Sequence, residues 1–387
     1  MRELLTILLP IFAIGPFVYY LLAIYGGWNF FAQRRKSSRV LDFAPPVSNL
    51  KPIKGVDPDA YENFASLCRQ DYPEYELLFC VDSDNTATIS VLHKLQRDFP
   101  DRSIRILFGS GRVAANDKAA KLTRLVNEAK YEVLVINDSD VRARPDYLRT
   151  VVSPLQNPDV GAVTLPYVPL SEQTFADELQ SVGMFSDFYA GVFVARVLDG
   201  VKFALGPTIA TTRSQLARFG GYASIENRPG DDLLIGRLIA ESGSRVEFLP
   251  YAVETVADFS SIRELIHKRL RWIVVMRHMR PWGHFGLAFT QGLPWSILAA
   301  IFAPNWSVAA AFLLLYVALR VILTWLIGHY GFKQKHMARK LLLIPAWDAM
   351  AFVIWLISFT RRSVRWRGSN YYIREGRLVP VASATGD

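Results

Sequence analysis

The chain has 387 residues, of which 51% are hydrophobic, so it is long enough for a sizeable folded core and for additional apolar segments. A net charge of +9 first suggests a nucleic-acid-binding protein, but the basic residues gather beside apolar segments, as in a membrane protein with cytoplasmic loops. We therefore expect no nucleic-acid partner. Two cysteines, Cys68 and Cys80, are too few for a disulfide framework or a metal cluster and are interpreted as packing residues.

The N-terminal segment predicts a membrane anchor. No charged residue occurs between Leu4 and Gln33, and the dense apolar part, Leu4–Tyr25, is long enough to cross a bilayer. A secretory signal would have a shorter apolar region and a small-residue cleavage site. Here aromatic residues and then the basic run Arg34–Lys36 follow, which is typical of an interfacial belt with a positive flank. The prediction is a retained transmembrane anchor over residues 1–36.

Residues 37–282 have the pattern of a soluble α/β domain. Apolar runs of strand length alternate with segments of helical spacing, which indicates a mostly parallel sheet with helices on both faces. The expected elements, alternating from strand to helix, are Glu76–Val81, Thr88–Phe99, Ile104–Phe108, Lys118–Ala129 and Glu132–Ile136. In such sheets ligands bind beyond the carboxyl ends of the strands.

Two acidic pairs follow the expected strands. Asp82 and Asp84 come after one strand, and Asp138 and Asp140 come after another. If strand alternation continues past Ile136, Asp138 and Asp140 point the same way and need a positive charge between them. A solvated turn is the plainer interpretation, because Asp and Ser are common turn residues. The shared placement past strand ends favours a binding site.

A third acidic pair, Asp231 and Asp232, precedes an apolar run with helical spacing and marks a helix start. Asp is a good N-cap residue, but a catalytic base can occupy the same position. The later segment His267–Arg280 is strongly basic. It suits either anionic lipid headgroups or a pyrophosphate. A divalent cation on Asp140, together with Arg271, would neutralise the charge that develops on a departing nucleotide diphosphate.

The remainder, residues 283–387, predicts a C-terminal membrane domain with a basic tail. The uncharged stretch Phe285–Leu319 is broken at Pro304, which predicts a helix, a tight turn and a second helix near Trp306–Gly328. Arg320 lies inside the second helix and needs a partner or an interface. Snorkelling to the headgroups is the plainer interpretation, and a place on the route of a lipid substrate is the sharper one.

The third apolar run, Leu341–Phe359, is either an interfacial or re-entrant helix or a fourth span. A span would place the basic residues between Arg361 and Arg377 outside the cell, against the positive-inside tendency. We therefore predict a cytosolic C-terminus, with residues 366–372 near the active site.

Several ordered motifs resemble one family. The acidic pairs, Asp232 and "KRLRW" at 268–272 follow the D,D,D,(Q/R)xxRW pattern of membrane-bound glycosyltransferases of families 2 and 21. Lys268 stands where that family usually has Gln or Arg. Three stretches are similar to ceramide glucosyltransferases and their bacterial relatives, which include hopanoid-associated enzymes: "KPIKGVDP" at 51–58, "DYPEYELLFCV" at 71–81 and "RVAANDKAAKL" at 112–122. The resemblance covers residues 50–282 and continues weakly to 364–372.

The resemblance implies a GT-A fold, which has a Rossmann-like and mostly parallel sheet, with transmembrane helices at both ends of the chain. It also implies inverting transfer from a UDP-sugar. Asp232 matches the general base, and Asp138 and Asp140 match the residues that hold UDP through Mn²⁺ or Mg²⁺. The positions that match nucleotide or pyrophosphate binding are Lys51, Asp82, Asp84, Asn116, Lys118, Asp138, Arg271 and Trp272. One base suffices for inverting chemistry, because the metal replaces the acid on the leaving side.

The preferred reaction is transfer of glucose from UDP-glucose to the hydroxyl of ceramide, giving a β-glycosyl lipid. Transfer of N-acetylglucosamine from its UDP-sugar to a hopanoid or another lipid is the alternative within enzymes. A non-catalytic nucleotide-binding membrane sensor is the alternative from another class, and it has no need of Asp232 or Trp272. Because UDP-sugars are cytosolic, residues 37–282 are expected to face the cytosol, at a bacterial inner membrane or a Golgi- or ER-type membrane.

Overall fold

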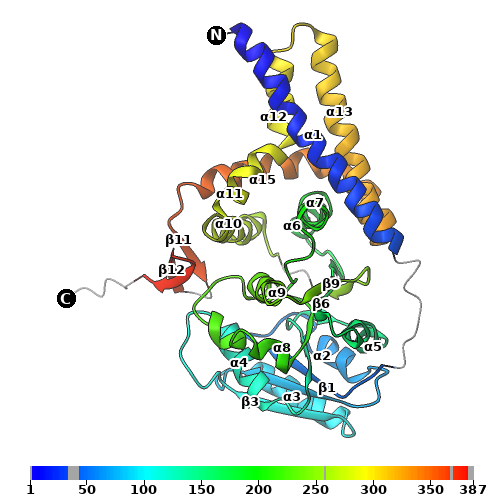
Figure 1. Ribbon diagram of the computed structural model, residues 1–387, viewed down its shortest axis with the longest axis vertical. Helices are drawn as coiled ribbons and strands as arrows, with labels where there is room; N and C mark the ends of the chain where they lie inside the picture. The colour runs from blue at the N-terminus through cyan, green and yellow to red at the C-terminus, as the bar shows by residue number, and fades with distance from the viewer. Residues whose placement is uncertain (1, 34–42, 257–258, 367–368, 382–387) are drawn as a thin grey trace, which may run out of the picture.

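Figure 1 shows a lower body built around a β-sheet and an upper helical bundle, with a layer of helices between them. The bundle consists of α1 (Arg2–Gln33), α12 (Gly292–Ile301) and α13 (Trp306–Thr324). The N-terminus is at the far end of the bundle, and the last described strands lie beside the body. This computed structural model describes residues 2–33, 43–256, 259–366 and 369–381.

The body contains a seven-stranded sheet in the order β3-β2-β1-β4-β8-β6-β9. Its strands are β1 (Val47–Pro52), β2 (Tyr75–Val81), β3 (Ser103–Phe108), β4 (Val133–Ile136), β6 (Val160–Thr164), β8 (Ile209–Thr212) and β9 (Arg245–Phe248). β8 is antiparallel to both neighbours, and the other pairings are parallel. Leu50 of β1 pairs with Leu78 of β2 and Ile136 of β4, so the carboxyl ends of these strands share one edge. The expected Rossmann-like sheet is confirmed.

Helices cover both faces of this sheet. Phe64 packs with Phe79 in the core on one face, and Leu122 and Ile235 pack with Leu78 on the other, as the alternation of strand side chains requires. The body helices are α2 (Ala60–Cys68), α3 (Thr86–Asp98), α4 (Asp117–Glu128), α5 (Tyr147–Val152), η1 (Ser153–Gln156), α8 (Arg213–Ala217), η3 (Gly221–Ile225) and α9 (Asp231–Glu241). A smaller sheet, in the order β5-β10-β7, consists of β5 (Val141–Arg142), β7 (Tyr167–Pro169) and β10 (Val253–Thr255).

The elements expected for the body are present. β2, α3, β3, α4 and β4 begin and end within two residues of the expected bounds. Cys68 and Cys80 are both buried, as expected for packing residues. Local periodicity predicted these elements because each one buries an apolar face or a complete strand against the common core.

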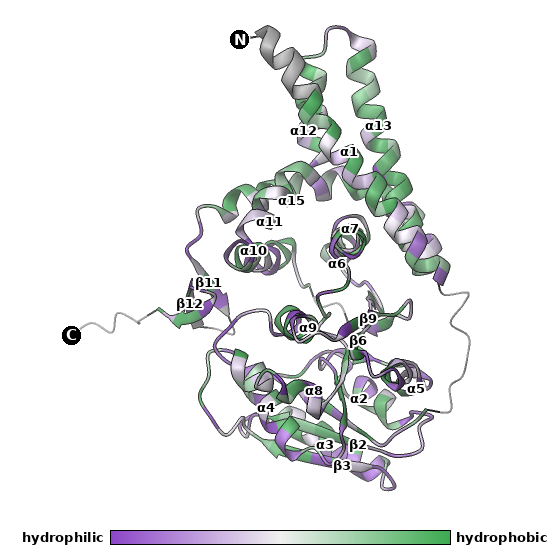
Figure 2. Ribbon diagram, viewed as in Figure 1, coloured by the Kyte–Doolittle hydropathy of each residue, from purple (hydrophilic) through white to green (hydrophobic). Residues whose placement is uncertain are grey.

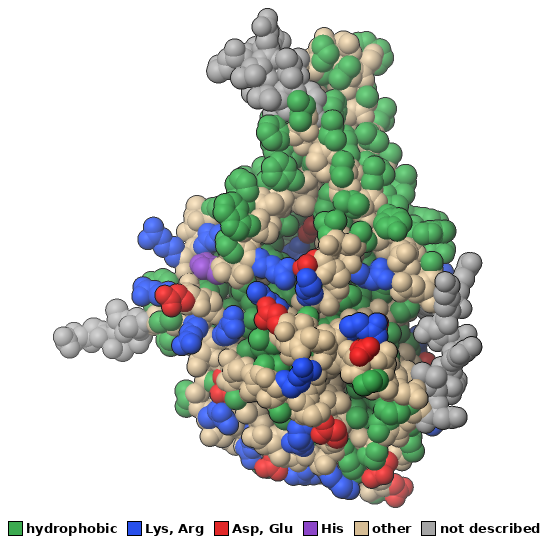
Figure 3. All heavy atoms as spheres, in the orientation of Figure 1, with side chains coloured by type: hydrophobic (Ala, Val, Ile, Leu, Met, Phe, Trp, Pro, Cys, Tyr) green, Lys and Arg blue, Asp and Glu red, His purple; other side chains and the backbone are tan. Residues whose placement is uncertain are grey.

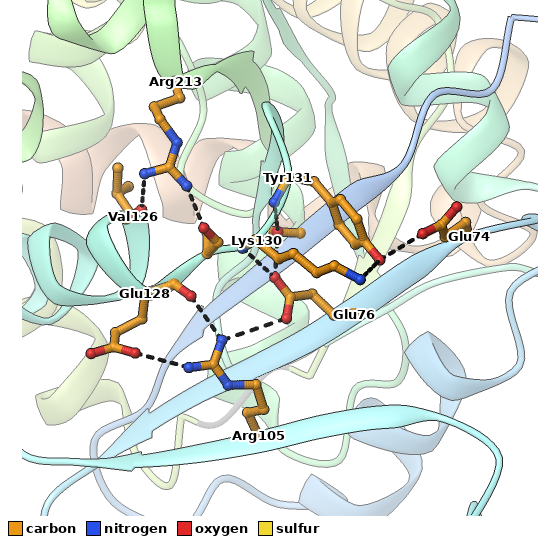
Figure 4. A network of polar contacts seen from close by, with 10 residues as sticks. Glu74, Glu76, Arg105, Val126, Glu128, Lys130, Tyr131 and Arg213 are labelled. Atoms are coloured by element: carbon orange, nitrogen blue, oxygen red, sulfur yellow. Dashed lines mark hydrogen bonds and ion pairs between the residues drawn. The ribbon is translucent and has the colours of Figure 1, made fainter.

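A polar network fixes the amino-terminal edge of the sheet (Figure 4). Glu76, near the start of β2, is only 3% exposed and accepts hydrogen bonds from Ser48 Oγ and Lys130 N, both at 2.6 Å. Arg105 of β3 forms two ion pairs: its Nη1 lies 3.6 Å from Glu76 Oε2, and its Nη2 lies 2.8 Å from Glu128 Oε2. A buried carboxylate with this many partners supports the fold. It lies at the edge opposite to the carboxyl ends of the strands, where a ligand is expected.

The middle layer joins the body to the bundle. It contains α6 (Phe175–Gly183), the π-helical turn η2 (Met184–Phe188), α7 (Tyr189–Asp199), α10 (Ile262–Met279), α11 (Pro281–Gly286), η4 (Leu287–Thr290) and α15 (Ile344–Ser358). The sequence pattern did not predict α6 and α7. Phe30 of α1 lies 5.1 Å from Phe193 of α7 and 4.6 Å from Phe248 of β9, between ring centroids. This aromatic cluster ties the first helix to both the middle layer and the main sheet.

Four described helical stretches are long and apolar enough to cross a membrane, as expected for a membrane protein: Ile11–Gln33, Phe175–Asp199, Trp306–Gly331 and Met337–Ser358. Figure 2 shows a mainly hydrophobic bundle above a mixed body, and Figure 3 shows Lys and Arg side chains gathered where the two meet. The stretch Phe175–Asp199 is 61% buried inside the protein, which suits its place in the middle layer. The predicted positive flank Arg34–Lys36 lies outside the described residues.

The first half of the stretch Phe285–Leu319 departs from the prediction of one helix before the turn. It is divided between the end of α11, η4 and α12, with non-helical backbone at Gln291. Gly286, Gly292 and Pro294 explain the division, because Gly and Pro weaken helix interiors. α12 has 10 residues and so rises about 15 Å, about half the hydrocarbon thickness. The prediction of one continuous helix before Pro304 was therefore wrong, whereas the second helix is confirmed as α13.

α15 lies across the base of the bundle rather than alongside it (Figure 1). It contacts α10 and α6, and a three-stranded sheet that follows it packs against α10. Leu378 N of that sheet donates a hydrogen bond to Asn227 O in the body (2.7 Å). The chain therefore leaves α15 on the side of the body, which favours an interfacial helix over a fourth span. The remaining elements are η5 (Trp325–Gly331), α14 (Met337–Lys340), η6 (Leu341–Leu343), β11 (Ser363–Trp366), β12 (Ser369–Arg374) and β13 (Arg377–Pro380).

Arg320 has an ion-pair partner, and the prediction that it snorkels is wrong. Its side chain is buried, at 3% exposure, and its guanidinium forms two hydrogen bonds with Asp348 of α15, of which Nε to Oδ2 measures 2.9 Å. It also donates to Ser186 O, and Tyr316 Oη donates to Asp348 Oδ2 (2.8 Å). A charge on one apolar helix is thus stabilised by a charge on another, as buried ions require.

Candidate active site

Asp138 and Asp140 lie in a turn at the carboxyl edge of the main sheet. β4 ends at Ile136, where its pairing with β1 and β8 also ends, and residues 137–140 form no strand. The expected continuation of strand alternation through the pair is therefore wrong. Both carboxylates nevertheless lie within electrostatic reach of Lys51: burial lowers the pKa of Lys51 to about 8, and Asp140 and Asp138 oppose that shift.

Lys118 joins this turn to α9. Its Nζ lies 2.6 Å from Asp138 Oδ1 and 3.2 Å from Asp231 Oδ2. Burial disfavours the ammonium, but the carboxylates of Asp138 and Asp231 outweigh that effect and raise the pKa of Lys118 well above its usual value. A permanently charged lysine therefore holds together two carboxylates that are far apart in the sequence.

Asp232 lies beside the same group of charges. Its Oδ2 accepts a hydrogen bond from Gly206 N (3.0 Å), and its Oδ1 accepts one from Leu233 N (2.8 Å). A Cβ on Gly206 would lie 3.0 Å from Asp138 Oδ2 and 3.2 Å from Asp232 Oδ2, so both carboxylates approach this glycine closely. Burial, and then the charge of Asp231, raise the pKa of Asp232 to about 6. Such a carboxylate is ionised at neutral pH and accepts a proton readily.

The N-cap of α9 is Gly230, so the interpretation of Asp232 as only a helix cap is wrong. Gly230 has φ 71°, a left-handed conformation that glycine adopts without strain, and no side chain caps the helix. A Cβ on Gly230 would lie 3.3 Å from Met279 Sδ, so α10 packs closely against the start of α9.

Three buried polar atoms near the turn lack hydrogen-bond partners in the described part of the chain. They are Lys51 Nζ, Asp57 Oδ2 and Asn137 Oδ1. Lys51 is only 1% exposed, and its ammonium lies over the ring of Phe64, 5.5 Å from the centroid. Buried donors and acceptors are normally paired. This place therefore suits a ligand that carries both acceptors and donors, as a nucleotide does.

Asp82 and Asp84 have different surroundings. Asp82 Oδ1 lies 2.7 Å from Nζ of Lys121, which is 1% exposed and also donates to Ile53 O (2.9 Å). Asp84 is exposed in the turn after β2. Asp82 is thus the residue that belongs to the polar edge of the sheet. Lys121 was missed, although its i, i+4 spacing from Asp117, with a 3.2 Å ion pair, was an available signal.

Asn116 supports the site through the backbone. Its Oδ1 accepts from Ala119 N (3.2 Å) and caps α4, and its Nδ2 donates to Arg228 O (3.0 Å). Its own N–H donates to Glu226 O (2.8 Å). The side chain therefore links the start of α4 to the loop before α9, and its predicted contact with a nucleotide stays a prediction.

Arg271 and Trp272 come from α10, which lies between α9 and the helical bundle (Figure 1). Trp272 is 42% exposed, and the guanidinium of Arg269 lies 5.7 Å from its ring centroid. Burial, and then the charge of Asp232, raise the pKa of the Tyr167 phenol, while Arg269 opposes the shift. Tyr167 and α10 therefore lie within electrostatic reach of the acidic cluster.

Gly206 and Tyr167 had no recognisable signal in the sequence. Each reaches the site from a segment that is distant in the chain, and neither belongs to a motif. Asp231 was seen as half of a pair, but its contact with Lys118 depends on packing of α9 against α4, which local periodicity does not report.

The Asp138 and Asp140 pair fits a hard divalent cation such as Mn²⁺ or Mg²⁺, for which carboxylate oxygens are suitable ligands. Burial, and then the charges of Asp138 and Asp57, raise the pKa of Asp140 to about 7, and a cation bound here would favour the ionised carboxylate. Within the described ranges there is no group of three or more His, Cys, Asp or Glu side chains placed to hold a metal. Mg²⁺ sites with one or two carboxylates are completed by substrate phosphates and water.

Comparisons with known proteins identify relatives of this chain and its family. Ceramide glucosyltransferase of Komagataella phaffii is 26% identical over 333 residues, which cover 70% of this chain and 65% of that protein. Ceramide glucosyltransferase 1 of Caenorhabditis elegans is 24% identical over 239 residues, which cover 61% and 51%. The chain thus spans between half and two thirds of the length of these relatives.

Among solved structures, mannosyltransferase PcManGT from Pyrobaculum calidifontis, in complex with GDP-Man and Mn2+, has a TM-score of 0.54 at 20% identity, and the match covers 92% of this chain and 99% of that chain. A likeness at this identity supports the fold, and the expected GT-A fold is confirmed. The family model described as Glycosyl transferase family 21 matches residues 8–379, nearly the whole sequence. The chain therefore belongs to glycosyl transferase family 21, as its motifs predicted.

Proposed function

We propose that this chain transfers a sugar from a UDP-sugar to the hydroxyl of a membrane lipid, with inversion at the anomeric carbon. Glucose is the proposed sugar and a ceramide-like lipid the proposed acceptor, because the curated relatives are ceramide glucosyltransferases. Helices long and apolar enough for a membrane support a lipid acceptor. The proposed orientation has the body in the cytosol, where UDP-sugars occur.

One observation carries the proposal: Lys118 joins Asp138 to Asp231, at 2.6 and 3.2 Å, and Gly206 lies against both Asp138 and Asp232. These contacts hold the turn proposed for the diphosphate close to the carboxylate proposed as base. Rigid placement of the reacting groups is the main requirement for a displacement in which one group leaves and another attacks.

Asp232 is the proposed general base. A lipid hydroxyl is a weak nucleophile until a base accepts its proton. One oxygen of Asp232 takes that proton as the hydroxyl oxygen attacks the anomeric carbon. The bond from this carbon to the diphosphate breaks, and its electron pair leaves with UDP. The hydrogen bonds from Gly206 N and Leu233 N orient the carboxylate for this step.

The nucleotide is proposed to occupy the carboxyl edge of β1, β2 and β4. Lys51 and Asp57 supply buried groups for it, and Asp82 is held in place by Lys121. Asp138 and Asp140 would hold a divalent cation, which when bound neutralises negative charge on the diphosphate. Arg271 and Trp272 are proposed to lie near the pyrophosphate and the acceptor.

UDP release by the purified chain in lipid vesicles tests the proposal. UDP-glucose alone, lipid alone and the two together are compared, with Mn²⁺ or Mg²⁺ and with excess EDTA. We expect UDP only when sugar donor and lipid acceptor are both present, with loss of turnover in EDTA and in the Asp140→Asn variant. A nucleotide-binding sensor would bind the donor without release. A hopanoid acceptor with UDP-N-acetylglucosamine is the second pair to measure.

A further inference from the structure

A second pocket lies outside the proposed active site, between α6 and the α14–η6 segment. It has a volume of about 360 Å³. Its lining residues are Phe175, Glu178, His336, Arg339, Lys340, Leu342 and Leu343. A volume above about 300 Å³ is typical of pockets that bind small ligands. None of these side chains belongs to the group around Asp138 and Asp232.

The apolar side of this pocket suits a membrane boundary. Leu342 is 88% exposed and Phe175 is 56% exposed. η6 leads directly into α15, which lies across the base of the bundle (Figure 1). Large apolar side chains with this exposure are expected to contact lipid rather than water at such a place. A ligand of the pocket therefore has an apolar part next to a polar one.

The charges in the pocket are of both signs, and two of them are available. Lys340 is mostly buried and forms an ion pair with Glu172. Arg339 and Glu178 are exposed, and neither side chain has a hydrogen bond or an ion pair with any residue in the described ranges. The pocket thus offers one guanidinium and one carboxylate, and the charges of these two groups cancel.

We propose that this pocket binds the headgroup of a zwitterionic phospholipid with a primary ammonium, such as phosphatidylethanolamine. Arg339 receives the phosphate, for which a guanidinium is well suited. Glu178 receives the ammonium, whose three N–H groups are donors. The methylated ammonium of phosphatidylcholine has no N–H to donate, and phosphatidylglycerol would leave Glu178 beside added negative charge. Leu342 and Phe175 contact the start of the acyl chains.

Lipid retention by the purified full chain tests this site directly. The protein is reconstituted in phosphatidylcholine vesicles that contain either phosphatidylethanolamine or phosphatidylglycerol, and bound lipid is measured by native mass spectrometry, together with the melting temperature. We expect preferential retention of phosphatidylethanolamine and a higher melting temperature with it. Arg339→Gln should weaken retention roughly fivefold. Glu178→Gln should remove the preference over phosphatidylcholine.

Lys335→Gln is the matched control, because Lys335 is exposed in the same basic run but does not line the pocket. Its lipid preference should equal that of the unchanged protein. Equal retention of the three lipids, a preference for phosphatidylglycerol, or the same loss in the Lys335 variant would each overturn the proposal. None of these outcomes depends on glycosyl transfer, so the proposed function is tested separately.

Discussion

Asp231 and Asp232 are adjacent carboxylates with different surroundings. Asp231 is 7% exposed and forms an ion pair with Lys118. Asp232 has backbone N–H donors instead, and burial together with the charge of Asp231 raises its pKa to about 6. Environments that differ in this way let one carboxylate remain structural while its neighbour exchanges protons.

The pKa of Asp232 predicts a pH dependence. The base must be ionised, so kcat/KM should fall as the pH decreases through about 6. Ionisation also costs folding stability between the usual pKa of 3.8 and about 6, because the folded state binds this proton more tightly. Asp232→Asn removes this cost but also replaces one of the two oxygens that accept backbone N–H groups, so its melting temperature at neutral pH should stay close to that of the unchanged chain. Turnover should fall on the order of a hundredfold or more.

The control for this variant is Asp101→Asn, which changes an exposed carboxylate away from the site. For both variants, rate profiles and melting curves are measured between about pH 5 and 8. This range includes the raised pKa of Asp232. Turnover of Asp232→Asn close to that of the control, or a profile that is flat through pH 6, would count against Asp232 as the base.

Among the structural elements, the loop before α9 connects the start of α4 with the C-terminal sheet. Asn227 Oδ1 accepts from Ala115 N (3.2 Å), just before α4, and Asn227 O accepts from Leu378 N of β13 (2.7 Å). Val274 of α10 packs in one cluster with Leu378. The C-terminal sheet therefore braces α10 and the loop that leads to the base, although it is distant in the sequence.

Asn227→Ala should reduce kcat roughly ten- to a hundredfold, because small displacements of reacting groups are costly. The KM for the donor should change less, since Asn227 does not line the edge proposed for the nucleotide. Asn227→Asp keeps the acceptor oxygen and should restore most of the rate. Asn157→Ala, in an exposed turn, is the control. Unchanged kcat in Asn227→Ala, with only a lower melting temperature, would reduce Asn227 to a structural role.

The Arg320–Asp348 pair predicts a coupled effect on stability. Arg320→Leu leaves Asp348 buried without its counter-ion, and breaking a buried pair costs about 3–5 kcal/mol. The double variant Arg320→Leu with Asp348→Leu removes both charges and should recover most of that loss. Unfolding in detergent micelles measures each variant. Losses that simply add in the double variant would contradict the pairing.

At the scale of the whole molecule, the sequence predicted what depends on local pattern. Strands and helices of the body follow from apolar periodicity, and the motif residues Asp138, Lys118 and Asp232 do lie together. The features that the sequence did not predict depend on contacts between residues that are far apart in the chain. The ion pair of Arg320 with Asp348, the close approach of Gly206 and the bracing by Leu378 join segments that no local spacing relates.

The fold also predicts the topology of the chain. β13 hydrogen-bonds to the body, so the C-terminus should share the cytosolic side proposed for the body. A cysteine added after Asp387 should react with a membrane-impermeant reagent only after cells are permeabilised. Background should be low, because Cys68 and Cys80 are buried. Labelling of intact cells from outside would place the tail on the other side of the membrane.

The proposed reaction involves the donor edge, the base and the membrane layer together: a sugar moves from UDP to a lipid hydroxyl with inversion. The most direct measurement is the mass and anomeric configuration of the lipid product formed from UDP-glucose and ceramide in vesicles, for the unchanged chain and for Asp232→Asn. We expect a β-glucosyl lipid from the unchanged chain and none from the variant. An α-linked product, free glucose without glycolipid, or equal product from the variant would contradict the proposed reaction.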